Sequence, residues 1–560
     1  MAAGRPYRRR SGCRWPPVSS NRGVLGLNSW SSRRPCLRAI SVAAALLATG
    51  CATSGPSERL GTLSADLLIR GGTVYPGGAE PFGGDVAISD DRIIAVGPSL
   101  QIAAKRVIDA SGMIIAPGFI DPHTHMQPWL TSAEAHTRVL EPFLLQGVTT
   151  AFIGNDGGGP IEVGALLDSA SARPVGVNYA VFTGFGTIRS KVIGNARQTP
   201  TDGELAKEQA LVHKAMCEGA IGISTGLFYA PQSFSKTDEV IALAAVAGAM
   251  GGIYDTHLRD ESNYNIGLSA AVDEAIRIAR ESGIAVHISH IKALGVDVQG
   301  SAPEIVGKIE AARAEGLAIT ASQYPWSASG TSLVASLVPL WAQDGGRIAM
   351  VERFDDAQQT ERLRAGIADN LRRRGGAGAL LIVEGDWSGQ RLREVAEALS
   401  TDPVTVAVTI IRRADPAVIS FNMDEADIAA FMRQPWVMTG SDASPKHPRT
   451  YGSFARKYDL YTRQERILSL QQFIDSSSAT TADFFHLEGR GHLRPGAFAD
   501  VVIFNPEAYS SLATYQNPDV PATGVRTVIV NGRIAVDDGK VTGLAAGRAL
   551  RHQPPAGSCD

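Results

Sequence analysis

Short apolar segments rich in β-branched residues alternate with alanine-rich amphipathic segments through the middle of the chain. The apolar segments are residues 148–153, 221–224, 252–256, 285–290 and 317–323, and the helical segments between them include 269–281 and 303–315. A strand that is apolar along its whole length is buried on both faces, which is typical of a parallel sheet covered by helices. The alternation therefore predicts an α/β fold, a (β/α)8 TIM-like barrel.

Both ends of the chain follow a different pattern, in which short alternating strands are separated by glycine turns. These strands are residues 66–70, 85–88 and 92–97 near the N-terminus and 499–504 and 525–533 near the C-terminus. We therefore expect residues 65–116 and 486–545 to form a small β-sandwich domain from both termini, beside a barrel spanning 117–485. Residues 333–420 fit the alternation poorly and are expected to form an insertion over the barrel mouth, and residues 546–560 a tail.

Composition limits the kind of partner that the chain can bind. The 560 residues are 44% hydrophobic, enough for a large core and more than one domain. Charged residues make up 19% and the formal net charge is −3. This near-balance provides no basic footprint for nucleic acid or for an anionic membrane surface, so we expect a small-molecule partner.

The first fifty residues contain many arginines, no acidic residue, and a short apolar run at 39–48. A run of this length cannot span a bilayer as a helix, so it predicts a signal peptide. The small residues before Cys51 resemble a lipoprotein lipobox with Ala48 in place of leucine, and residues 32–38 resemble a twin-arginine motif with Cys36 in place of phenylalanine.

We therefore expect residues 1–51 to be an export signal and 52–64 a linker, in an exported periplasmic or membrane-anchored bacterial lipoprotein. Its only membrane contact would be a lipid anchor at Cys51. The alternative is an arginine-rich leader that follows from a wrongly assigned start codon. Without the leader and with Cys51 acylated, two cysteines are left, Cys217 and Cys559. No disulfide framework is expected, and Cys217 is expected to be an inert core thiol.

Histidines stand at the ends of several predicted strands. His123 and His125 follow an apolar strand and a Pro-Gly turn, and their i, i+2 spacing directs both imidazoles to one side. His257 and His290 each close an apolar strand, on the same rim of the barrel. Zinc binds histidine nitrogen and carboxylate oxygen, so these four predict a metal site. The remaining histidines that we considered are expected to be structural: His136, His213, His287, His486, His492 and His552.

Several further motifs accompany these histidines in chain order. They are residues 147–150, 154–157, 254–261, 288–292, 322–326, 440–442 and 447–449, with 493–496 and 499–502 near the C-terminus. In this combination the chain resembles the D-aminoacylase (N-acyl-D-amino-acid deacylase) family of the amidohydrolase superfamily, from about residue 65 to residue 543.

The resemblance implies an enzyme that uses one or two divalent ions, with zinc as the expected metal, to hydrolyse N-acyl-D-amino acids or peptides containing D-amino acids. It assigns metal ligation to His123, His125, Asp156, His257, His290 and Asp442. Asp442 is also the expected catalytic residue: it would accept a proton from metal-activated water and return it to the leaving amine. Lys292, Tyr324 and Arg449 are expected to bind the carboxylate of the substrate.

Two positions depart from the family pattern. Asp156 stands where the family has a bridging cysteine, and a carboxylate is a harder ligand than a thiolate, so metal identity and number stay open. Gly330 stands where a hydroxyl residue is expected near the substrate. Alternatives are a dipeptidase or cyclic-amide hydrolase on the same scaffold, or an inactive binding lipoprotein. The carboxylate-binding residues disfavour a cyclic amide, and Asp442 disfavours a pure binding module.

Overall fold

Eight parallel strands form the central barrel of the computed structural model, which describes residues 64–559. They are β6 (Phe119–Asp121), β7 (Val148–Ile153), β8 (Asn178–Gly184), β9 (Gly222–Gly226), β10 (Ile253–His257), β11 (Ala285–Ile288), β12 (Ile319–Gln323) and β16 (Val437–Thr439), hydrogen-bonded in this order. The (β/α)8 prediction is confirmed. The predicted leader, Cys51 and all of the linker except its last residue lie outside the described residues.

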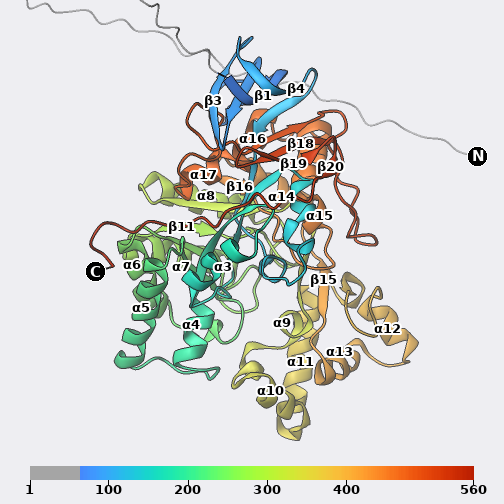
Figure 1. Cartoon of the computed structure of the whole chain (residues 1–560). Coiled ribbons are helices and arrows are strands. Elements are labelled where there is room, and N and C mark those ends of the chain that lie inside the picture. Colours follow the sequence, from blue (N-terminus) through green and yellow to red (C-terminus); the bar gives the residue numbers. More distant parts are fainter. Residues whose placement is uncertain (1–63, 560) are drawn as a thin grey trace, which may run out of the picture. The chain divides into compact units, whose positions relative to one another are not determined.

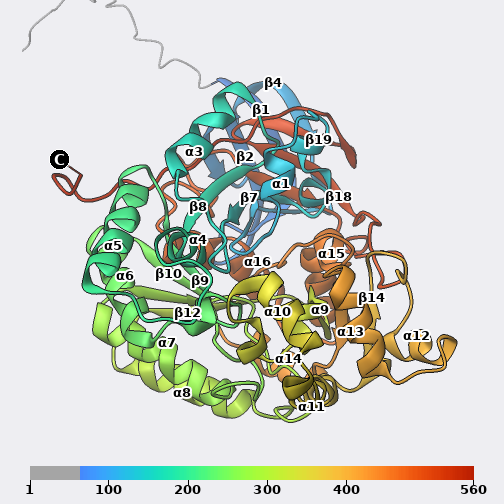
Figure 2. The same cartoon turned by 90° about the horizontal axis from the view of Figure 1, so that it is seen from below.

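Helices surround the barrel strands, and Figure 2 shows several of them following one another around it. They are α3 (Val163–Ala172), α4 (Phe185–Val192), α5 (Asp202–Cys217), α6 (Thr237–Ala249), α7 (Leu268–Ser282), α8 (Ala302–Ala314), α14 (Glu425–Met432), α15 (Arg449–Arg456), α16 (Leu470–Ser477) and α17 (Ala479–Phe484). Every residue of β7 is buried, as expected for a strand rich in β-branched and apolar residues within a parallel sheet. Helix α7 buries Leu268, Val272 and Ala279 and ends at Gly283, whose φ of 71° is the left-handed conformation of a helix C-cap.

The first and last barrel strands meet beyond their own ends. Thr124 and Ala443 form a parallel bridge. The carbonyl of His123 accepts a hydrogen bond from the Asp442 amide, and the carbonyl of Ala443 accepts one from the His125 amide, both at 2.9 Å. The barrel therefore closes through the residues that carry the candidate ligands.

Strands from both ends of the chain form one β-domain, where Figure 1 shows the blue and red strands close together. They are β1 (Ser64–Val74), β2 (Phe82–Ser89), β3 (Arg92–Gly97), β4 (Ala103–Asp109), β5 (Ile114–Pro117), β17 (Val501–Phe504), β18 (Val525–Val530), β19 (Arg533–Asp537) and β20 (Lys540–Val541). Because β5 pairs with both β1 and β17, strands from the two ends of the chain share one sheet: eight of them follow one hydrogen-bonded path, and β4 pairs with β1 beside it.

The segment between β12 and β16 contains a compact insertion with a core of its own. Its sheet is β13 (Ala328–Ser332), β15 (Ala417–Phe421) and β14 (Leu380–Ile382), and its helices are α9 (Leu333–Leu337), α10 (Gly346–Asp355), α11 (Ala357–Arg373), α12 (Leu392–Ala398) and α13 (Pro403–Arg413). Leu363, Ile367, Val406 and Ile411 are among its buried residues. Strand β13 begins five residues before the expected start at 333, and Figure 1 shows the insertion at lower right.

The C-terminal strap, residues 546–559, packs against the outside of the barrel and ends in a disulfide. The Tyr179 amide donates to the Arg548 carbonyl, and the Leu550 amide donates to the Tyr179 carbonyl. Cys559 is bonded to Cys217 at the end of α5, across a sequence separation of 342 residues. The expectation of an inert Cys217 thiol is wrong, because the strap brings together two cysteines that are remote in sequence.

Candidate metal centre

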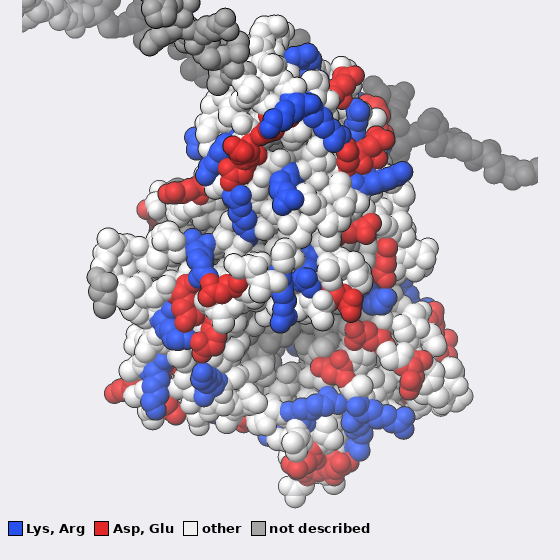
Figure 3. All heavy atoms as spheres, in the orientation of Figure 1, with Lys and Arg blue, Asp and Glu red and all other residues white. Residues whose placement is uncertain are grey.

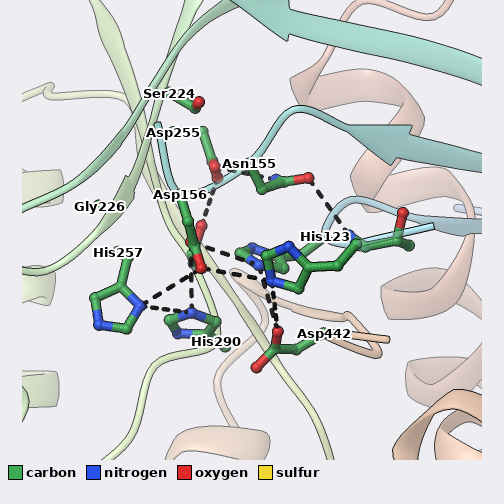
Figure 4. A network of polar contacts seen from close by, with 12 residues as sticks. His123, Asn155, Asp156, Ser224, Gly226, Asp255, His257, His290 and Asp442 are labelled. Carbon is green, nitrogen blue, oxygen red and sulfur yellow. Dashed lines mark hydrogen bonds and ion pairs between the residues drawn. The ribbon is translucent and has the colours of Figure 1, made fainter. Parts of the chain in front are cut away.

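All six candidate ligands lie at the carboxyl ends of barrel strands. His123 and His125 follow β6, Asp156 follows β7, His257 ends β10, His290 follows β11 and Asp442 follows β16. Parallel strands bring these ends to one rim of the barrel, where loop residues can converge without disturbing the buried strands. Figure 4 shows the side chains of Asp156, His257, His290, His123 and Asp442 directed toward one another.

The carboxylate of Asp156 lies between two pairs of imidazoles. Its Oδ1 is 3.6 Å from His123 Nε2 and 3.7 Å from His290 Nε2, and its Oδ2 is 3.5 Å from His125 Nε2 and 3.8 Å from His257 Nδ1. His123, His125 and Asp156 form one group able to hold an ion, and Asp156, His257 and His290 form a second. The carboxylate of Asp156 therefore belongs to both of these groups.

Asp442 lies against the first of these groups. Its Oδ1 is 3.1 Å from His125 Nε2 and 3.6 Å from His123 Nε2. Burial disfavours its charged form, but the Arg449 guanidinium and the neighbouring imidazoles outweigh burial and lower the pKa of the Asp442 carboxyl. A carboxylate in this position is ionised at neutral pH and can accept a proton.

The donor set fits a divalent metal of the zinc type. His123 Nε2 and Asp156 Oδ1 are buried and have no hydrogen-bond partner within residues 64–559. Buried polar atoms are normally hydrogen-bonded, and a cation at the centre of the cluster would satisfy both. Burial lowers the pKa of His257 to about 4, which keeps its imidazole in the neutral form that coordinates metals.

Three of the six residues have a left-handed backbone. The φ angles are 56° at Asp156, 36° at His290 and 51° at Asp442. Side-chain-bearing residues rarely adopt this conformation, and such positions are concentrated at functional sites. Next to Asp156, Gly157 has a φ of 72°, and a Cβ there would lie 2.0 Å from Gln232 Oε1. Gln232 in turn donates from Nε2 to the Asp156 carbonyl at 2.9 Å, which fixes the loop.

A second layer of polar residues supports the ligands from below. Asp255 accepts hydrogen bonds from Asn155 Nδ2 at 3.0 Å and from Ser289 Oγ at 2.7 Å, and these donors neighbour Asp156 and His290. Burial raises the pKa of Asp255 to about 7. On the opposite side, Asp121 accepts from the Ser441 amide at 3.0 Å. The two aspartates connect the ligand-bearing loops of neighbouring strands, as hydrogen-bonded partners do around metal sites.

The three residues expected to bind substrate lie together beside the candidate ligands. Lys292 Nζ and the Arg449 guanidinium lie 5.7 and 5.1 Å from the centre of the Tyr324 ring. Lys292 pairs with Glu261 Oε1 at 2.6 Å, and Arg449 pairs with Asp442 Oδ2 at 2.6 Å. The buried Tyr324 hydroxyl has no partner among the described residues. All three can donate to one anionic group.

Sequence reasoning missed several residues that line the same pocket, among them Tyr229, Glu261 and Arg374. Glu261 lies 3.2 Å from His290 Nδ1 and 3.6 Å from His257 Nε2 in addition to its bond to Lys292. Glu261 lies four residues after His257 in the 254–261 motif, and this position could have marked it as a site residue. Its burial beside the histidines could not be read from the sequence. The histidines expected to be structural are absent from this cluster within the described residues; for example, His287 bonds to Thr320 Oγ1.

The pocket around the cluster continues into a wider chamber of about 320 Å³. The two share His125, Asp156, Tyr229, Gly330 and Thr331. Gly330 therefore does line the pocket, and Thr331 supplies a hydroxyl next to it. Figure 3 shows the surface hollowed between the barrel and the insertion, with both basic and acidic side chains around the hollow.

Known proteins share this architecture and match the chain over most of its length. The sequence model of the amidohydrolase family matches residues 106–536. D-aminoacylase of Alcaligenes xylosoxydans xylosoxydans is 34% identical over 516 residues, covering 87% of this chain and 97% of that protein. A D-aminoacylase structure described as having a binuclear metal centre is 31% identical with a TM-score of 0.75, covering 87% of this chain and 100% of that one.

The structure of N-acyl-D-glutamate deacylase from Bordetella bronchiseptica, in complex with zinc and a phosphonate mimic of the tetrahedral intermediate, is also similar. It is 28% identical with a TM-score of 0.74, and the match covers 87% of this chain and 100% of that one. The fold, the extent of these matches and the cluster at the barrel rim lead to one conclusion: the chain belongs to the amidohydrolase family, in the group of D-aminoacylases and N-acyl-D-amino-acid deacylases.

Proposed function

We propose that the protein hydrolyses the amide bond of N-acyl-D-amino acids, or of peptides containing D-amino acids, with one or two divalent ions. The observation that carries the proposal is the position of Asp156 between two histidine pairs, with Asp442, Lys292 and Tyr324 in the same pocket and Arg449 in the chamber that adjoins it. The activities named for the similar D-aminoacylase and N-acyl-D-glutamate deacylase support it.

His123, His125, Asp156, His257, His290 and Asp442 would hold the metal. When bound, a divalent ion polarises the amide carbonyl and supplies a nucleophile at neutral pH. Asp442 accepts the proton released during attack and delivers it to the leaving nitrogen, because its carboxylate is ionised and lies at the rim of the ligand cluster. Arg449 orients this carboxylate through their ion pair.

Hydrogen-bond donors around the Tyr324 ring bind the carboxylate of the substrate. Lys292 Nζ, the Tyr324 hydroxyl and the Arg449 guanidinium converge on the volume beside the ligands. A carboxylate bound there has charge-assisted hydrogen bonds, which hold the amide at a fixed distance from the cluster. This arrangement favours a linear amide with a free carboxylate over a cyclic amide.

The test couples metal analysis of the purified protein to hydrolysis of paired N-acetyl-D- and N-acetyl-L-amino acids, with a dipeptide and a hydantoin as further substrates. We expect one or two equivalents of divalent metal, loss of activity with a chelator, and turnover of the D-substrates. Metal-independent turnover, or preference for the hydantoin or for the L-substrates, would contradict the proposal.

We also infer export of the protein and acylation at Cys51. Support comes from the leader pattern and from the Cys217–Cys559 disulfide, a bond that persists in oxidising compartments and is rare in the cytosol. Within residues 64–559, no helix is both long and apolar enough to cross a bilayer. Fractionation of a bacterial host with labelled palmitate tests the inference; we expect label in the membrane fraction that a Cys51→Ser variant lacks, and a cytosolic, unlabelled wild-type protein would overturn it.

A further inference from the structure

Three cations line or border the pocket, and they differ in how their charge is neutralised. Lys292 pairs with Glu261, and Arg449 pairs with Asp442. Arg374, which lines the pocket together with Lys292 and Tyr324, forms no ion pair with any residue between 64 and 559. It is therefore the cation in this group with unused capacity for an anion.

Arg374 is held in place by neutral groups. It follows the last residue of α11 in the insertion and is 1% exposed. Its Nε donates to the Ser336 carbonyl at 3.2 Å, and its Nη1 donates to Ser420 Oγ at 3.1 Å. Its Nη2 donates to no described residue. The bonds from Nε and Nη1 fix the orientation of the guanidinium, and its Nη2 remains free to donate to an anion.

The two arginines that precede Arg374 both form ion pairs, which Arg374 does not within residues 64–559. Arg373 pairs with Asp369 at 2.7 Å, and Arg372 pairs with Asp297 at 2.7 Å, both near the surface. A buried arginine cannot lose its charge and is costly to desolvate without an anionic partner. An anion delivered by the substrate would complete the site.

We propose that Arg374 binds a second carboxylate of the substrate, so that the preferred substrates are N-acyl-D-amino acids with an acidic side chain. The inference rests on the proposed deacylase function and narrows its substrate class. Lys292, Tyr324 and Arg449 bind the carboxylate common to all such substrates, and Arg374, contributed by the insertion, reads the side chain. Among similar proteins, the N-acyl-D-glutamate deacylase accepts a substrate of this class.

The first measurement uses the unmodified metal-loaded enzyme. Values of kcat/KM are compared between N-acetyl-D-glutamate and N-acetyl-D-glutamine, and between N-acetyl-D-aspartate and N-acetyl-D-asparagine, because each pair differs in charge and hardly in shape. We expect preference for the acid by about 10- to 100-fold in at least one pair, the size of a charge-assisted hydrogen bond. Equal or greater turnover of both amides would overturn the proposal while leaving the deacylase function standing.

The second measurement uses Arg374→Met, with Arg374→Lys as the conservative variant. The methionine variant is expected to lose the acid preference mainly through a higher KM for the acidic substrate, with the amide substrate nearly unchanged; lysine should restore part of the preference. Arg372→Met removes an exposed arginine from the same helix and should keep the wild-type ratio.

An equal loss on acids and amides would overturn the proposal, because it would assign Arg374 to the common carboxylate or to folding. Absence of any turnover of D-substrates by the metal-loaded wild-type enzyme would refute the deacylase function itself.

Discussion

Asp442 combines contacts that are seldom found on one side chain: two imidazoles, a guanidinium and a left-handed backbone. Asn at this position keeps the shape but cannot carry a proton. We expect Asp442→Asn to lower kcat at least about 100-fold, within the usual range for general acid–base catalysis. Metal content should stay near the wild-type value, because four histidines and Asp156 are retained. Steady-state kinetics and elemental analysis check both.

A matched control is Asp273→Asn, which removes a carboxylate from an exposed ion pair with Lys308. It should leave turnover unchanged, since surface pairs of this kind contribute little. Near-normal turnover of Asp442→Asn would remove this residue from proton transfer.

Asp156 is expected to influence how many ions the site holds, because it belongs to two of the three groups of candidate ligands; the third group is His123, His290 and Asp442. Asp156→Ala should therefore reduce bound metal, and Asp156→Cys should retain it with a stronger preference for zinc over manganese, since thiolate is the softer ligand. Competitive loading followed by elemental analysis measures the preference. Unaltered stoichiometry in Asp156→Ala would show that the aspartate is not a ligand.

At the level of elements, the C-terminal strap is held by backbone hydrogen bonds and by one disulfide at its end. Cys217 and Cys559 close a loop of 342 residues, and a cross-link of this span restricts the unfolded chain strongly. Cys217→Ser should lower the free energy of unfolding by about 2–4 kcal/mol and expose residues near Cys559 to proteases. Urea denaturation under oxidising conditions measures the first effect, and mass spectrometry of limited digests measures the second.

Reduction of the wild-type protein serves as the control for the strap. A thiol reductant should shift the wild-type urea midpoint to that of Cys217→Ser and leave the variant unmoved. A midpoint that does not respond in either protein would mean that the strap is held by its hydrogen bonds alone.

Strands rich in β-branched and apolar residues were predictable with close boundaries. Residues 148–153 were predicted as a strand, and β7 has the same limits. Strand β8, Asn178–Gly184, was not singled out; it begins with the polar Asn178, which is buried within the fold. A polar residue that is buried and hydrogen-bonded cannot be distinguished from a surface residue by sequence alone.

The candidate site was predictable to the extent that its residues follow strands. Five of the six candidate ligands stand at or just after a predicted strand, and parallel strands bring their ends to one rim; Asp442 was assigned from the family resemblance. Glu261 and Arg374 were missed because they contact residues that are remote from them in the sequence. The Cys217–Cys559 bond was missed for the same reason.

The stability of the whole molecule should depend on pH through one buried lysine. Lys457 is 1% exposed, and its Nζ donates to Thr439 Oγ1 at 2.8 Å and to Ser476 Oγ at 3.1 Å. Burial lowers its pKa from 10.5 to about 7. Between these values the unfolded chain holds a proton that the folded protein has released, so stability rises with pH across this window.

Lys457→Met should remove this slope, which is about 1.4 kcal/mol per pH unit for one proton. The variant should be more stable than the wild type at pH 7, and its advantage should shrink by pH 9, as measured by urea unfolding at both pH values. Thr439 and Ser476 have other hydrogen-bond partners, Ser477 and the Phe473 carbonyl, and should tolerate the loss. An advantage independent of pH would contradict the assigned titration.

The left-handed backbone at Asp156, His290 and Asp442 has a consequence for attempts to improve this protein by directed evolution. Glycine adopts such conformations freely, so replacing any of the three by glycine relieves backbone strain and deletes a side chain of the site. Selection for heat resistance alone would therefore enrich inactive sequences at these codons, and a screen must score turnover and melting temperature in the same round.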